Sequence, residues 1–234
     1  MAVVESTPID TVGPPDTVPG ARAAALAGLA GIALCTGLVL ALHVLAPDPG
    51  PAYTMISNYA LGGYRPLFDL GVLVLVAGSA AVVAALVATG AVRPGGAATR
   101  LLLTWCAGMV LVVAFPTTSS TLPPTPEAVV HAAGAVAGFA ALPMGALATA
   151  RDWRAVHARR AAVLRALAVL SLALLVPVLG GIAPGSPVAV QVVGDVPFGL
   201  LQRVLAVVDL ALLVVLATGA LARADGSGPP RFAR

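Results

Sequence analysis

The chain alternates between long apolar runs and short polar segments. Each run lasts roughly 20 residues, and a helix of that length crosses the hydrocarbon core of a bilayer. Only helices and closed barrels can cross lipid, and none of the runs shows the alternating polarity of a barrel strand. The pattern therefore predicts an all-α, polytopic transmembrane bundle of six helices. The expected spans are residues 23–45, 67–89, 97–115, 129–150, 161–183 and 199–222.

Two short segments flank this transmembrane domain, which we place at residues 21–222. Residues 1–20 are rich in proline and carry three acidic residues but no basic one. A signal peptide begins with a positive segment, so we expect residues 1–20 to form a disordered tail and the first apolar run to be retained. Residues 223–234 are expected to form a C-terminal tail.

The basic residues, all of them arginines, fall almost entirely at alternate ends of the six runs. Only Arg65 and Arg203 flank the opposite ends. Because positively charged residues stay on the cytoplasmic side, we expect both tails in the cytoplasm. The lack of lysine and the wealth of alanine, valine, glycine and proline indicate a GC-rich bacterial genome, so the expected location is the bacterial cytoplasmic membrane. The arginines on the cytoplasmic side are Arg22, Arg93, Arg100, Arg151, Arg154, Arg159, Arg160, Arg165, Arg223, Arg231 and Arg234.

The composition supports this interpretation and narrows the partners. Hydrophobic residues make up 59% of the chain and charged residues only 10%, against about 25% charged residues in soluble domains. The net charge is +3, and the arginines flank apolar runs without interleaved aromatic residues. Membrane lipids rather than nucleic acid are therefore the expected partners. Cys35 and Cys106 lie inside apolar runs and form no CxxC pair, so we expect two buried thiols.

Two features concern the packing of the fourth run. Gly134 and Gly138 are four residues apart, a spacing that predicts the close approach of a neighbouring helix. Trp153 and His157 lie in the arginine-rich segment that follows. We expect both of these side chains at the headgroup boundary.

Polar and ionisable residues gather on the arginine-poor side, and within a membrane such residues are candidates for function. Asp209 lies ten residues beyond Gly199, about 15 Å into the bilayer at the helical rise. Gln202 shares its helix face, whereas Arg203 points elsewhere. We expect Asp209 either to form a structural hydrogen bond or ion pair between helices, or to bind a proton or a ligand.

Further ionisable residues lie where the runs begin and end. His131 begins the fourth run, four residues after Glu127, and either binds a loop carbonyl or exchanges protons near neutral pH. Asp69 follows Arg65 by four residues, a spacing that allows a local ion pair. Others on the same side are His43, Asp48 and Asp195.

No catalytic motif stands out in this sequence. Catalytic zinc usually takes three protein ligands, and only His43 and His131 lie on the arginine-poor side, without HExxH-like spacing. Ser57, Ser119 and Ser120 lie in loops without the GxSxG turn of a serine hydrolase. The sequence therefore favours a protein that is not an enzyme and that holds no metal or cofactor.

Four short segments stand out along the chain: ISNYALGG (Ile56–Gly63), AFPTT (Ala114–Thr118), the helix start at His131 and GLLQR (Gly199–Arg203). In this order they resemble the DUF998 family of bacterial and archaeal integral membrane proteins of unknown function. The resemblance covers about residues 25–222 and implies six helices with a shared group of polar residues on one face, but it supplies no mechanism. The chain departs from the family at Asn58–Ala60 of the first segment, and at Thr117 and Thr118, where the family often has an acid.

The leading hypothesis is that the arginine-poor side binds a lipid or a small molecule. Arg203 would pair with Asp69 or an anionic headgroup, with hydrogen bonds from His131 and Tyr59, although the same network could simply hold the helices together. One alternative is a proton-coupled transporter or channel that uses Asp209 and His131; another is a membrane-embedded lipid-modifying enzyme. The oligomeric state stays open. The candidate binding residues are Asn58, Tyr59, Arg65, Asp69, His131, Gln202 and Arg203.

Overall fold

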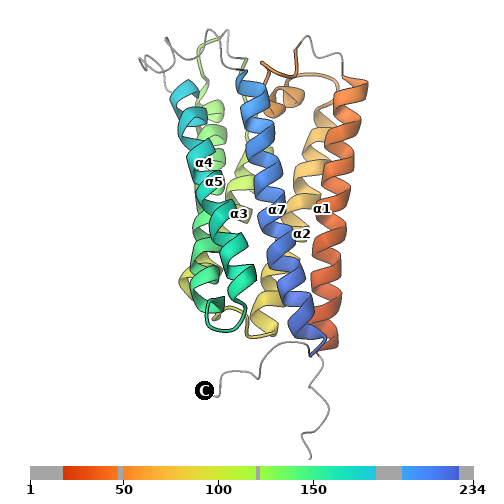
Figure 1. Ribbon diagram of the computed structural model, residues 1–234. Helices are drawn as coiled ribbons and strands as arrows, with labels where there is room; N and C mark the ends of the chain where they lie inside the picture. Colours follow the sequence, from red (N-terminus) through yellow and green to blue (C-terminus); the bar gives the residue numbers. More distant parts are fainter. Residues whose placement is uncertain (1–17, 47–49, 120–121, 183–196, 227–234) are drawn as a thin grey trace, which may run out of the picture.

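The computed structural model describes residues 18–46, 50–119, 122–182 and 197–226, and this part of the chain is helical and without strands (Figure 1). Each of its six long helices is long and apolar enough to cross a membrane. The predicted all-α class with six spans is therefore confirmed. The elements are α1 (Pro19–Leu45), the short 3-10 helix η1 (Ile56–Leu61), α2 (Arg65–Ala88), α3 (Ala97–Ala114), α4 (Pro126–Trp153), α5 (Ala158–Ile182) and α7 (Phe198–Ala224).

Most of the helices extend beyond the apolar runs that predict them. α1 begins at Pro19 and α4 at Pro126, because proline fits the first turn, where its missing N–H would have no helical partner. The side chain of Thr125 accepts a hydrogen bond from the backbone N–H of Ala128 and caps α4. Apolar length thus marks the part that crosses lipid, whereas local caps decide where each helix begins.

Parts of the expected tails fall outside the described residues. Residues 19 and 20, assigned to the disordered tail, already belong to α1, and residues 1–17 are not described. The residues Asp48, Ser120, Asp195, Arg231 and Arg234 also lie outside the described part of the chain.

The helices form a closed ring in chain order, with α7 packed against α1 as well as against α5, α2 and α4. The start of α1 and the end of α7 meet, since the backbone N–H of Val18 donates to the carbonyl of Ala224 and Arg22 Nε lies 3.1 Å from Asp225 Oδ1. This arginine-rich end carries the start of α1, the end of α7 and the α2–α3 and α4–α5 connections (bottom of Figure 1). The arginine-poor end carries the start of α2 with Arg65 and the start of α7 with Arg203.

Two helix pairs approach each other through glycines. A Cβ added to Gly31 of α1 would lie 2.9 Å from the Cα of Gly78 in α2, and one added to Gly108 of α3 would lie 2.5 Å from the carbonyl oxygen of Gly134 in α4. Gly138 also lies against Gly108. The close approach expected from Gly134 and Gly138 is therefore confirmed, with α3 as the partner helix.

Trp153 closes the arginine-rich end of the bundle. Its side chain is fully buried, its indole N–H donates to the carbonyl of Ala91 at 3.0 Å, and its ring lies against Gly219, where an added Cβ would collide with it. The ring of Trp153 therefore faces the inside of the bundle, and its expected depth at the headgroup boundary stays a prediction. Gly219 leaves room for the ring inside the bundle, and Ala91 supplies the acceptor that an indole needs when it is buried.

Candidate functional site

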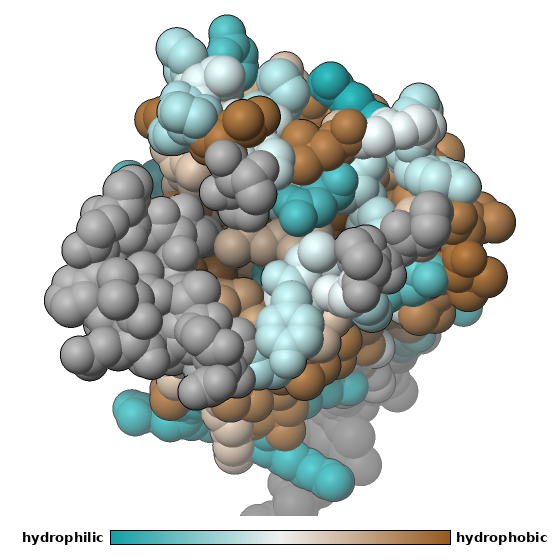
Figure 2. Space-filling model, turned by 90° about the horizontal axis from the view of Figure 1, so that it is seen from above, coloured by the Kyte–Doolittle hydropathy of each residue, from teal (hydrophilic) through white to brown (hydrophobic). Residues whose placement is uncertain are grey.

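The arginine-poor half of the bundle contains a cavity of about 810 Å³. All six long helices contribute to its wall, together with residues 55–57 and 117–119 and Leu122 and Pro124. Seen from this end, hydrophilic and hydrophobic residues mingle over the described surface (Figure 2). The ring of helices, packed tightly at the other end, therefore opens into a chamber here.

The cavity reaches about the middle of the helices. It is lined from Cys35 to His43 on α1 and from Gln202 to Leu210 on α7, and each stretch rises about 12 Å. That depth is close to one leaflet of a hydrocarbon core about 30 Å thick. The deepest lining residues of the six helices, which we call the floor layer, are Cys35, Leu75, Trp105, Phe139, Leu175 and Leu210.

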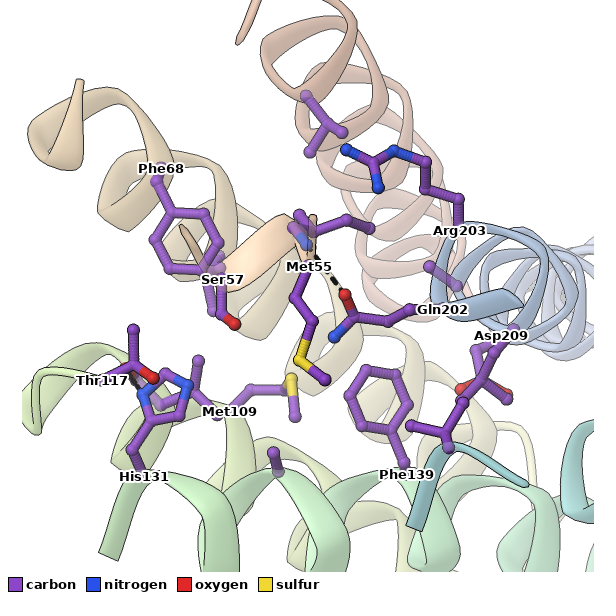
Figure 3. A pocket seen from close by; sticks show the side chains of 18 of the residues that line it. Met55, Ser57, Phe68, Met109, Thr117, His131, Phe139, Gln202, Arg203 and Asp209 are labelled. Atoms are coloured by element: carbon purple, nitrogen blue, oxygen red, sulfur yellow. Dashed lines mark hydrogen bonds between the residues drawn. The ribbon is translucent and has the colours of Figure 1, made fainter. Parts of the chain in front are cut away.

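The deeper wall is apolar and adaptable. Met55 and Met109 both line the cavity (Figure 3), and methionine side chains can re-pack around ligands of different shape. Trp105 and Phe139 pack edge to face with ring centroids 5.8 Å apart, and Trp105 donates to Ser79 Oγ at 3.1 Å. This wall suits an apolar chain rather than a polar solute.

Arg203 is held at the mouth by hydrogen bonds that include three to described residues. Its Nε donates to His43 Nε2 at 2.7 Å, and its Nη1 donates to the carbonyl oxygens of Thr54 at 2.7 Å and Gly199 at 3.0 Å. Because His43 Nε2 accepts this bond, the proton of the neutral ring belongs on Nδ1, which lies 2.7 Å from the carbonyl oxygen of Val39. These bonds fix the orientation of the Arg203 guanidinium, and its partner His43 is held in one tautomer.

The side chains of Gln202 and His131 bind backbone groups of η1 and of the end of α3 at the cavity wall. Gln202 Oε1 accepts a hydrogen bond from the backbone N–H of Ile56 at 2.7 Å (Figure 3). His131 is buried, with Nδ1 3.0 Å from the carbonyl oxygens of both Val112 and Phe115. It therefore satisfies carbonyls at the end of α3, which would otherwise lack partners. This geometry matches the carbonyl-bound alternative for His131.

Asp209 links two helices in the deep part of the cavity. The side chain is 2% exposed, and its Oδ1 accepts a hydrogen bond from Ser171 Oγ on α5 at 2.6 Å. One of the two expected arrangements, an interhelical hydrogen bond, is therefore present. Ser171 itself gave no stronger sequence signal than any other lone serine in an apolar run.

The cavity gathers only some of the predicted site residues. His131, Gln202, Arg203 and Asp209 line it, whereas Asn58, Tyr59, Arg65 and Asp69 do not. Arg65 Nε lies 3.3 Å from Asp69 Oδ2, in the local pair that their spacing allows. The expected pairing of Arg203 with Asp69 is wrong in this structure, because Asp69 is engaged by Arg65 and Arg203 Nε is engaged by His43.

Two of the predicted site residues outside the cavity lie on η1. Tyr59 is buried and packs edge-on against His43, with ring centroids 5.5 Å apart, while Asn58 lies beside it on η1. His43 was a weak sequence candidate because a histidine at the end of an apolar run commonly faces the headgroups. Its contact with Arg203 spans 160 residues of sequence and has no local signal. No group of three metal-binding side chains occurs in the described ranges.

Six apolar helices around a half-depth cavity define a multi-pass helical membrane protein. The model of the DUF998 family, described as a protein of unknown function, matches residues 29–219, and the chain belongs to this family. The match contains every residue that lines the cavity. No curated protein and no solved structure matches the chain.

Proposed function

We propose that this protein binds an amphiphile, either a membrane lipid or a lipid-like small molecule, in the cavity of its arginine-poor half. The observation that carries the proposal is the cavity itself, which is about 810 Å³ in volume and has a mostly apolar wall with a few polar groups. Ligand sites typically have volumes of about 300–1,000 Å³ and this kind of lining. The apolar part of the ligand would lie between the helices, over the floor layer.

The polar part of the ligand would lie at the mouth, beside Gln202 and Arg203. A guanidinium presents several donors in a plane and suits carboxylate and phosphate oxygens. Its bonds to His43 and to two backbone carbonyls hold Arg203 in place before a ligand arrives. An anionic headgroup at the mouth would therefore meet a positive charge of fixed position.

The arginine asymmetry supports an orientation for this site. Nine arginines of the described chain belong to the arginine-rich end or to the helix turns next to it, and two to the opposite end. By the positive-inside bias, the described ends of α1 and α7 would face the cytoplasm. The cavity would then belong to the outer leaflet of a bacterial cytoplasmic membrane.

Binding fits the packing better than proton-coupled transport through Asp209 and His131. A transporter needs a polar route to both faces, but on α7 the residues below the cavity include Leu212, Leu213 and Leu216, which are almost fully buried in apolar surroundings. Among the described residues, none closer to the arginine-rich end than the floor layer lines the cavity. Within the described residues, the lining of this cavity is thus confined to one half of the bundle.

The test fills the cavity with a side chain and measures binding of dansyl-labelled undecanoic acid by its fluorescence in detergent. Ala135→Phe places a ring in the cavity, whereas Ala137→Phe, on the exposed face of the same helix, serves as the matched control. We expect Ala135→Phe to weaken binding about tenfold or more, the equivalent of about 1.4 kcal/mol, and Ala137→Phe to leave it unchanged. Wild-type affinity in a folded Ala135→Phe protein would overturn the proposal.

A further inference from the structure

The carboxyl group of Asp209 is only half satisfied. Its Oδ1 accepts the hydrogen bond from Ser171. Its Oδ2 is buried and has no hydrogen-bond partner among the described residues, although the residue lines the cavity (Figure 3). A polar atom of this kind needs an explanation, because more than nine in ten buried polar groups have a partner.

No described residue donates a hydrogen bond to this oxygen. Leu175 and Leu205, which lie one helical turn from Ser171 and Asp209, belong to one buried apolar cluster, and Phe139 packs against this cluster. These side chains are apolar, and the hydrocarbon of a bilayer supplies no donor either. A buried oxygen without a donor costs about 1–3 kcal/mol, and more when it is charged. The contents of the cavity are the remaining source of a partner.

The geometry points to a ligand that carries a hydrogen-bond donor, a hydroxyl or an amino group, at the buried end of its apolar chain, where it binds Oδ2 of Asp209. This inference rests on the proposed function and specifies its ligand class. Arg203 and Asp209 are six residues apart on one helix, which corresponds to about 9 Å of rise. The ligand class is therefore a bipolar amphiphile with an acidic group at the mouth and a donor near the floor layer.

The decisive experiment compares ligands that differ only at the buried end. Decanoic acid, ω-hydroxydecanoic acid and ω-aminodecanoic acid each displace dansyl-labelled undecanoic acid from the full-length protein in detergent. We expect the wild type to bind at least one ω-substituted acid about tenfold more tightly than decanoic acid. The stronger of the two then distinguishes a hydroxyl from an amino end group.

Three variants test whether the preference depends on the carboxyl group of Asp209. Asp209→Leu removes the carboxyl group, so it should bind decanoic acid but lose the preference for the ω-substituted acid. If the leucine variant does not fold, Asp209→Asn is used in its place. This variant is expected to reduce the preference for the ω-substituted acid. Ser171→Ala keeps Asp209, so it should keep the preference. Partition of each acid into detergent is the same for all variants and cancels in the comparison.

The outcomes distinguish this inference from the function on which it rests. Equal affinities of the wild type for all three acids, with normal binding of the dansyl probe, would overturn the role of Asp209 but leave the proposed cavity function intact. A preference that survives in Asp209→Leu would do the same. A wild type that does not bind the dansyl probe would overturn both.

Discussion

The two halves of the bundle use the same helices in opposite ways. Near the arginine-rich end, the helices are sealed by Trp153, which fills the space over Gly219 and bonds to Ala91. In the arginine-poor half, side chains that could pack together instead line a cavity, and the polar contacts run between helices and loops. The difference indicates that one half provides stability and the other provides space.

Among the substitutions that test this difference between the two halves, Trp153→Ala is expected to have the largest effect on stability. Removing a fully buried tryptophan leaves a void and an unpartnered carbonyl at Ala91, and such substitutions cost about 3–5 kcal/mol in soluble proteins. We expect a clear fall in the midpoint of thermal unfolding in detergent. Val39→Ala, which only enlarges the existing cavity, should cost about 1 kcal/mol or less. Similar losses for the two variants would contradict the division between a packed half and an open half.

The glycine contacts give a smaller effect with an internal control. Gly31→Ala would force a methyl group against the backbone of Gly78, whereas Gly37→Ala on the same helix meets nothing within 4 Å. Overpacking costs about 1–3 kcal/mol, while alanine in an open helical position gains up to about 1 kcal/mol over glycine. We expect the two variants to shift the unfolding midpoint in opposite directions. A lower unfolding midpoint for Gly37→Ala would show that helix contacts do not decide whether a glycine-to-alanine substitution stabilises or destabilises the bundle.

The sequence could predict the spans but not the cavity, and the reason is physical. Lipid demands roughly 20 apolar residues per helix, so run length reveals each span without knowledge of its neighbours. The cavity wall, with Met109 and Leu175, uses the same residue types as a packed core, and only the positions of the helices distinguish the two. The pair Arg65–Asp69 follows from spacing on one helix. The contact of Arg203 with His43 depends on how two helices are rotated, which spacing does not encode.

The smallest expected effect is on ligand affinity, and it distinguishes the two arginines of the arginine-poor end. Arg203→Gln removes the charge at the mouth and should weaken binding of dansyl-labelled undecanoic acid about tenfold, or about 1.4 kcal/mol. Arg65→Gln should change the affinity less than about twofold, because Arg65 is partly exposed in a local pair outside the cavity, and such pairs contribute little. Dansyl-labelled undecanol, which has no negative charge, should bind both variants as well as the wild type. If Arg203→Gln weakens the binding of the acid and the binding of the alcohol equally, the arginine shapes the mouth through Thr54 and His43 rather than attracting an anionic group.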